Sequence, residues 1–453
     1  MPKDLTEGSI IKSLISLSIP LILMNILQTL YQITDAFWVG QLGTDAVAAV
    51  SLTFPILFFV ISALMGFTVA GTVLISQYKG QKNPQKINHV STQIFFLILF
   101  SSFILSIIGF FITPYIVGFI DTETYIQENA TAYLQVAFLG LVFMFPYHIF
   151  QALHRGIGEV KIPMYIILFA VLLNFFLDPI FINGYGPIPA FGVVGSAIVT
   201  ILAQGIAAVI ATIIMLKGMF GIKLDIKELK VMDTTLLKKI FKIAIPSSIQ
   251  FTTNSLSMVV LIFIVSMFST STISAYGIGT NILNFIMMPT MGIGFATSVL
   301  VGQNIGALKK NRALKVAKMS ILATFMALIL IAIILVIFSD FVVGLFIKST
   351  NLDDIETLKL GIEFIGYLAV TFCLFGPIHI IMSAFTGAGR TKLSMIISMV
   401  VVWVFRIPLA YLLAVILNQQ ALGIWISFPL SSFFSLIIAL IVFYKYDWAR
   451  EII

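Results

Sequence analysis

Long apolar segments constrain the fold of this chain more than any other feature. A helix needs about 20 apolar residues to cross a bilayer, and the sequence contains twelve such segments. They span residues 12–38, 46–77, 90–114, 126–153, 160–182, 191–216, 236–268, 273–304, 313–346, 357–386, 391–416 and 421–446. Only 10% of the residues are charged, against about 25% in soluble domains. The sequence therefore predicts an all-α integral membrane protein with twelve transmembrane helices.

The lysines and arginines predict how these helices are oriented. Almost all of the 26 basic residues fall in loops that would lie on one side of the membrane, and the exceptions are Lys348, Lys359 and Arg406. Since basic loops favour the cytoplasmic side, we expect both termini in the cytoplasm. This distribution accounts for the net charge of +7 without a nucleic-acid partner. The absence of a GxxxxGK[ST] phosphate loop argues against an ATP-driven pump.

The two halves of the chain resemble each other. A shift of 226 residues aligns Pro20 with Pro246, and a shift of 231 aligns Gly156 with Gly387. We interpret this as the duplication of a six-helix unit. Because six is even, both copies enter the membrane from the same side, which predicts two lobes related by a pseudo-two-fold axis along the membrane normal. The predicted parts are an N-lobe at 1–220, a cytoplasmic linker at 221–235 and a C-lobe at 236–453.

Two acids lie deep inside predicted membrane segments. Asp35 lies in the first segment and Asp178 in the fifth. An acid at the bilayer centre costs about 2.5–3.5 kcal/mol on insertion scales, so the acids must face inward, be paired or stay protonated. In the second half, Leu261 and Leu409 occupy the corresponding positions. Since the packing needs of the two halves are similar, acids in one half alone indicate a function.

Other polar residues of the first half can join these acids. Asn174 precedes Asp178 by four residues, so the two share one helix face. The remaining candidates for a polar cavity are Gln28, Tyr31, Tyr133, Gln151 and Ser196. Carboxylate, amide and hydroxyl oxygens suit protons or a hard cation such as Na⁺. The predicted ion-coupling site consists of Asp35, Asn174, Asp178 and Ser196. The alternative is that both acids stay protonated and serve only as structural hydrogen-bond donors.

Two further residues carry hypotheses of their own. Pro20 interrupts the hydrogen-bond ladder of the first helix about four turns before Asp35. We predict that this helix bends or straightens at Pro20 as Asp35 changes protonation, and a static kink is the alternative. Arg406 is the one cation inside a predicted segment. It is expected either to face a cavity of the C-lobe and meet substrate or a backbone carbonyl, or to make a structural contact.

Several motifs of the chain resemble one transporter family. They are TDAFWVGQLG from residue 34, NFFLDP from residue 174 and the paired turns RGIGEVKIP and TGAGRTKLS. Together with the duplication, they resemble the multidrug and toxic compound extrusion (MATE) family over the whole chain. Acids on both the first and the fifth helix resemble its prokaryotic, archaeal-type members.

The resemblance implies roles for the candidate residues. It implies that Asp35, Asn174 and Asp178 bind the coupling proton or sodium ion, and that Ser196 supplies the hydroxyl of a usual threonine. At the cavity positions, Gln28, Tyr31 and Tyr133 match the family, whereas Gln151 stands in place of an asparagine.

We therefore expect a monomeric antiporter of the cytoplasmic membrane, without a cofactor. It would export amphipathic, often cationic organic compounds in exchange for H⁺ or Na⁺. One alternative is a lipid-linked oligosaccharide flippase of the same superfamily, which would need a large cationic cavity where this chain offers Arg406 alone. Another is a non-transporting membrane scaffold, for which the sequence offers no soluble signalling domain. An enzyme is not expected, because no nucleophile–base pair or metal cluster is evident.

Overall fold

The computed structural model describes residues 4–120, 122–230, 233–347 and 351–450. Across these residues the secondary structure is helical, apart from one isolated bridge between Tyr185 and Ile188. Twelve of the helices are long and apolar enough to cross a membrane, which confirms the predicted all-α class and the twelve spans. Lys348, which entered the charge argument, and residues 231 and 232 of the predicted linker lie outside the described residues.

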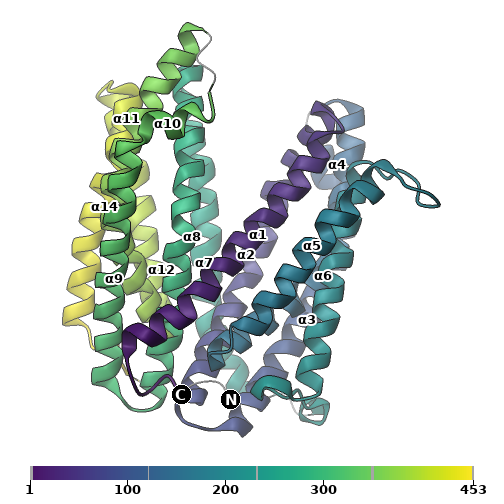
Figure 1. Ribbon diagram of the computed structural model, residues 1–453, viewed down its shortest axis with the longest axis vertical. Coiled ribbons are helices and arrows are strands. Elements are labelled where there is room, and N and C mark those ends of the chain that lie inside the picture. Colours follow the sequence, from purple (N-terminus) through teal and green to yellow (C-terminus); the bar gives the residue numbers. More distant parts are fainter. Residues whose placement is uncertain (1–3, 121, 231–232, 348–350, 451–453) are drawn as a thin grey trace. The chain divides into compact units, whose positions relative to one another are not determined.

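The spanning helices follow the predicted segments closely (Figure 1). They are α1 (Ile10–Gly40), α2 (Thr44–Gly80), α3 (Pro84–Gly118), α4 (Thr124–Ile157), α5 (Lys161–Asn183), α6 (Val193–Leu216), α7 (Thr234–Val265), α8 (Thr270–Gly306), α9 (Lys310–Ile337), α11 (Leu352–Gly387), the composite span 391–416 and α14 (Gln420–Lys445). The composite span joins α12 (Thr391–Met399), the π-helical η3 (Val400–Arg406), α13 (Ile407–Tyr411) and the π-helical η4 (Leu412–Ile416). Short helices are η1 (Met219–Gly221), η2 (Ile226–Lys230) and α10 (Ser339–Gly344).

The predicted ninth segment, 313–346, is divided into two helices. Phe338 has φ −106° and ψ 20°, outside the α-helical region, so α9 ends before it and α10 begins after it. Hydrophobicity alone gives no sign of this break, because the residues on both sides are apolar.

The helices pack into two compact units. The first contains residues 19–248 together with Asp4, and the second contains residues 5–18 and 249–450. The helices α1 and α7 therefore each begin in one unit and end in the other, and the change falls beside Pro20 and Pro246. The predicted lobes, 1–220 and 236–453, and the axis that relates them stay predictions.

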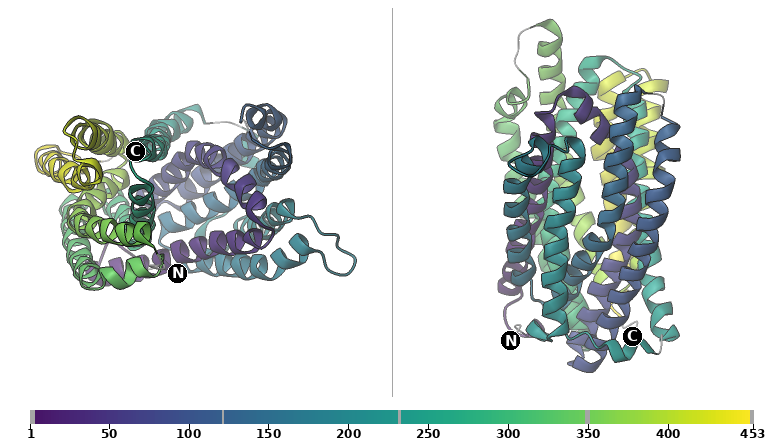
Figure 2. Two further views of the ribbon diagram at one scale, coloured as in Figure 1. Left: turned by 90° about the horizontal axis from the view of Figure 1, so that it is seen from above. Right: turned by 90° about the vertical axis from the view of Figure 1, so that its right-hand side faces the viewer.

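Each unit repeats the same internal arrangement, and Figure 2 shows its helices as a bundle. In the first unit α4 packs against α2, α3 and α6, and in the second α11 packs against α8, α9 and α14. A Cβ atom on Gly156 would lie 3.0 Å from the carbonyl oxygen of Thr72, and one on Gly387 would lie 2.2 Å from that of Ser298. These close helix contacts occupy equivalent positions, as a duplication requires.

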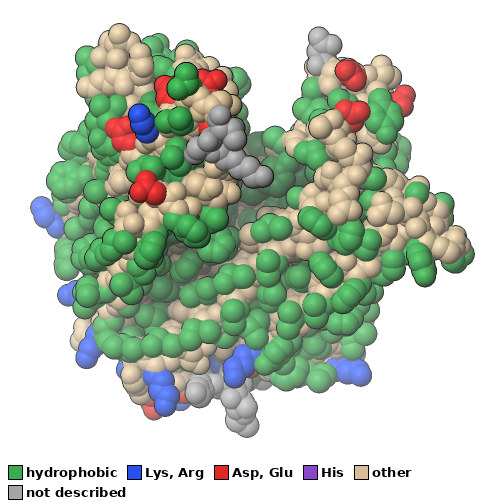
Figure 3. Space-filling view, turned by 45° about the horizontal axis from the view of Figure 1, so that its top comes forward, with side chains coloured by type: hydrophobic (Ala, Val, Ile, Leu, Met, Phe, Trp, Pro, Cys, Tyr) green, Lys and Arg blue, Asp and Glu red, His purple; other side chains and the backbone are tan. Residues whose placement is uncertain are grey.

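The surface of each unit is suited to lipid. Hydrophobic side chains cover the flanks visible in Figure 3, whereas Lys and Arg side chains gather mainly toward the lower ends of the helices in that view. Phe111 and Phe263, for example, are each 68% exposed. Contiguous apolar surface of this kind marks an interaction with membrane or protein, and here the spanning helices carry it.

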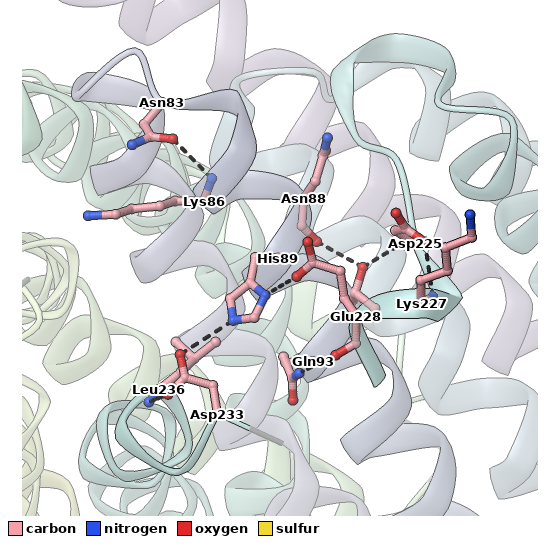
Figure 4. A network of polar contacts seen from close by, with 11 residues as sticks. Asn83, Lys86, Asn88, His89, Gln93, Asp225, Lys227, Glu228, Asp233 and Leu236 are labelled. Atoms are coloured by element: carbon pink, nitrogen blue, oxygen red, sulfur yellow. Dashed lines mark hydrogen bonds and ion pairs between the residues drawn. The ribbon is translucent and has the colours of Figure 1, made fainter. Parts of the chain in front are cut away.

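A polar network ties the connection between α6 and α7 to the start of α3 (Figure 4). The His89 ring on α3 lies between two acids: its Nδ1 contacts Glu228 of η2, and its Nε2 lies 3.4 Å from Asp233 Oδ2, just before α7. Gln93 donates from Nε2 to the Glu228 carbonyl over 3.2 Å. This connection is therefore packed onto the first unit through specific polar contacts.

Candidate functional site

The structure brings the two predicted acids together through one amide. In the first unit, Asn174 Nδ2 donates to Asp35 Oδ1 over 2.9 Å and to Asp178 Oδ1 over 3.2 Å. The two carboxyl groups also interact directly with each other. Residues from α1 and α5, 139 positions apart in the sequence, thus form one polar cluster.

Burial makes this cluster costly unless its charge is compensated. Asn174 and Asp178 are fully buried, and Asp35 is half-buried. Two carboxylates that face each other away from water repel strongly, so one of them must hold a proton or a cation must lie beside them. The geometry therefore provides a place where binding one positive charge is favourable.

The partner that the sequence reasoning missed is Thr200 on α6. Its Oγ1 donates to Asp35 Oδ2 over 3.2 Å, and its backbone carbonyl accepts a hydrogen bond from the Tyr31 hydroxyl over 3.4 Å. Thr200 follows Ser196 by four residues, so both lie on one face of α6. The hydroxyl residue one helical turn after Ser196 was the signal that could have found it.

Several oxygens at the site have no hydrogen-bond partner. Asn174 Oδ1, Asp178 Oδ2 and Ser196 Oγ are buried, and none of them has a hydrogen-bond partner within the described part of the chain. Ser196 is 1% exposed and bonds to neither acid, so its part in ion binding stays a prediction. Buried oxygens that lack donors fit a hard cation such as Na⁺, which binds through oxygen ligands.

The other cavity candidates differ in how near they lie to the acids. Tyr31 is buried beside Thr200, as above, and Tyr133 on α4 lies close enough to both acids to interact electrostatically. Gln28 is half-buried on α1, and no hydrogen bond joins it to either acid in the described residues. Gln151 pairs with Tyr147 instead.

Two predicted residues make no contact that joins them to this cluster in the described residues. Pro20 is buried inside α1, which continues as one helix on both sides of it. Arg406 belongs to the second unit, at the end of η3. The structure therefore joins Asp35, Asn174, Asp178, Thr200 and Tyr31 in one cluster. The predicted roles of Pro20 and Arg406 stay predictions.

Comparison with known proteins identifies relatives over nearly the full length. The family model described as MatE matches residues 20–180 and 246–412. The "probable multidrug resistance protein YoeA" of Bacillus subtilis is 28% identical over 450 residues, covering 98% of this chain and 96% of that protein. The "probable multidrug resistance protein NorM" of Thermotoga maritima is 26% identical over 456 residues, covering 100% and 96%.

Solved structures share the fold. A structure described as the outward-facing conformation of a multidrug resistance MATE family transporter superposes with a TM-score of 0.88 at 23% identity, covering 97% of this chain and 96% of that one. A crystal structure described as MATE in the bent conformation gives 0.90 at 22% identity, with the same coverage. At this identity the similarity establishes the architecture.

Proposed function

Since the chain belongs to the MatE family, we propose that it is a secondary active multidrug efflux antiporter that exchanges amphipathic, cationic organic compounds for H⁺ or Na⁺. The names of its full-length relatives support the export of drugs. We place it in the cytoplasmic membrane, as a monomer with both termini in the cytoplasm and with no resident cofactor. The family is one of transporters, so the chain is not an enzyme.

One observation supports the coupling step above all others. Asn174 bridges Asp35 and Asp178, while oxygens of Asn174 and Asp178 remain without donors. A proton or Na⁺ bound here removes the repulsion between the carboxyl groups. We propose Asp35, Asn174, Asp178 and Thr200 as the ion-coupling residues, with Ser196 as a further oxygen ligand when Na⁺ is the ion.

Coupling follows if the ion and the drug favour different conformations. A cationic drug carries a positive charge of its own, so it competes with the ion for the same two carboxyl groups. An ion taken up from outside then promotes release of the drug, because each ligand shifts the population toward the state that it binds better. In this proposal the cavity residues of the first unit are Gln28, Tyr31, Tyr133 and Gln151, and Arg406 is a substrate-contacting residue of the second unit.

Pro20 is the proposed hinge of the first helix. Proline supplies no backbone N–H to the ladder, and the division between the two structural units falls at residues 18 and 19, directly before it. Related structures are described as bent and as straight conformations. We assign the corresponding change in this chain to α1 at Pro20, triggered when Asp35 gains or loses its positive partner.

Export from proteoliposomes under an imposed pH or Na⁺ gradient tests the coupling. Asp35→Asn and Asp178→Asn should each lower gradient-driven export of the cation tetraphenylphosphonium by about tenfold or more, because an amide takes up no proton at neutral pH and offers Na⁺ no negative charge. Asp45→Asn is the matched control, since Asp45 is an exposed acid at the start of α2 and its loss should leave export unchanged. Undiminished export by both site variants would remove the coupling proposal.

A further inference from the structure

Arg406 is a cation placed near the middle of a membrane span in the second unit. Ten residues separate it from Ile416, the nearer end of the span 391–416, which corresponds to about 15 Å along a helix. Half of a bilayer's hydrocarbon core is also about 15 Å thick. Arg406 therefore belongs to the central part of the span and to neither of its ends.

The contacts of Arg406 orient its charge without neutralising it. Its Nε donates to Ser431 Oγ over 3.2 Å and its Nη2 to Ser432 Oγ over 3.3 Å. Its Cζ lies 4.6 Å from the centre of the Phe428 ring. Among the described residues, no carboxylate forms an ion pair with it. Hydroxyls and an aromatic ring stabilise a cation, but they leave its full charge in place.

One edge of the guanidinium makes no hydrogen bond. The group has five N–H donors, and its two hydrogen bonds to serine use one from Nε and one from Nη2. Nη1 makes no hydrogen bond within the described part of the chain, and the Arg406 side chain is half-buried. Nη1 and the second hydrogen of Nη2 form the edge that binds a carboxylate through two parallel hydrogen bonds.

The surroundings hold this edge in a fixed position. Ser431 and Ser432 are fully buried on α14, and Ser431 Oγ donates a hydrogen bond to the Phe428 carbonyl over 2.9 Å. Phe428 packs edge-on against Phe364, which stacks on Trp425 with 4.0 Å between ring centres. Arg406 also ends a π-helical turn, a rare backbone form that is frequent at functional sites.

We propose that Arg406, positioned by Ser431 and Ser432, binds the carboxylate of a transported organic compound. The inference rests on the proposed export function and assigns to it a specificity-determining residue, one that recognises a carboxylate on the transported compound.

Equilibrium binding of two fluorescent probes tests this proposal without any ion gradient. Dansyl-glycine carries a carboxylate, and dansyl amide has the same ring system without the charge. With purified protein in phosphatidylcholine nanodiscs, dansyl-glycine should bind about tenfold or more tightly than dansyl amide, because a charge-assisted bidentate hydrogen bond is added. Arg406→Gln should abolish this preference. Arg406→Lys should retain part of it, since lysine keeps the charge but lacks the planar pair of N–H donors.

Arg155→Lys provides the matched control. Arg155 is also a helical arginine bonded to a hydroxyl, that of Thr72, but it lies in the first unit, so the preference should stay unchanged. Equal binding of both probes by the wild-type protein would overturn the proposal even if the Arg406 variants fail to fold. Loss of dansyl-glycine binding when phosphatidylglycerol replaces part of the phosphatidylcholine would assign the guanidinium to a headgroup instead. Neither result depends on the export assay with Asp35→Asn, so the two proposals fail separately.

Discussion

At the residue scale, one hydroxyl group donates a hydrogen bond to the Asp35 carboxyl group and is expected to matter for coupling. Thr200 supplies this hydroxyl, whereas Ser196, one turn earlier, bonds to neither acid. Thr200→Val keeps the shape of the side chain and removes the donor, and an unpaired buried acceptor costs about 1–3 kcal/mol. We expect the initial rate of gradient-driven export to fall about tenfold, since 1.4 kcal/mol is a factor of ten.

Ser196→Ala, measured in the same proteoliposomes, should reduce export less than Thr200→Val does. If Ser196→Ala reduced export more than Thr200→Val, Ser196 would supply the hydroxyl needed for coupling. This result would contradict the assignment of Thr200. Sequence alone does not discriminate between these residues, because both lie on one face of α6. The choice depends on which hydroxyl reaches Asp35 in the fold, and that is Thr200.

At the element scale, the contact of α11 with α8 depends on a glycine. A Cβ atom on Gly387 would lie 2.2 Å from the carbonyl oxygen of Ser298, so Gly387→Ala should force the helices apart at a cost of about 1–3 kcal/mol. Gly366 lies in the same helix with open space around its Cβ position, and Gly366→Ala should be neutral or stabilising by up to about 1 kcal/mol. Thermal unfolding of both variants in detergent measures the difference, and equal midpoints would contradict this packing.

The contacts at the start of α7 predict how the stability of the protein depends on pH. The backbone N–H of Leu236, assisted by the nearby His89 ring and the N–H of Thr235, holds the pKa of Asp233 below its usual value. A lowered pKa in the folded state adds stability that is present above the ordinary aspartate pKa of about 3.9 and is lost as pH falls through the folded value. The wild-type unfolding temperature should therefore drop as the pH is lowered from about 5 toward 3.

Two variants separate the helix cap from the charge of Asp233. Asp233→Ala should lower stability at pH 7 by about 1 kcal/mol, as the loss of an N-cap does, and should flatten the acid dependence. Asparagine still caps a helix, so Asp233→Asn should keep most of the stability at pH 7 and lose only the acid dependence. If all three proteins respond to acid in parallel, Asp233 is not the group responsible.

Element boundaries show where sequence reasoning reached its limit. Twelve spans were predictable because apolar length and alternating basic loops are properties of the sequence itself. The break at Phe338 and the π-helical turns that end at Arg406 were not, since they depend on the hydrogen-bond register of backbone flanked by equally apolar side chains. The meeting of Asp35 with Asn174 was only inferred from shared polarity, because no local pattern links residues on different helices.

At the scale of the whole molecule, the distribution of basic loops predicts which ends of the helices face the cytoplasm. Twelve spans place the loop between α2 and α3 on the same side as the termini and the loop between α5 and α6 on the other side. The chain has a single cysteine, Cys373, so Cys373→Ala provides a background for cysteine labelling. In that background, Lys82→Cys and Tyr185→Cys report on the two sides, since both positions lie in connections between helices.

A membrane-impermeant maleimide applied to intact cells should label Tyr185→Cys and leave Lys82→Cys unlabelled until the membrane is permeabilised. The physical reason is that translocating lysine-rich loops across the membrane is disfavoured, so the connection with Lys82, flanked by Lys79 near the end of α2 and Lys86 near the start of α3, stays inside. Labelling of Lys82→Cys in intact cells would show that the protein has the opposite orientation in the membrane. With that orientation, an inward ion gradient would drive the exchange in the reverse direction. The reason is that each conformation would then expose the Asp35–Asn174–Asp178 cluster to the opposite side of the membrane.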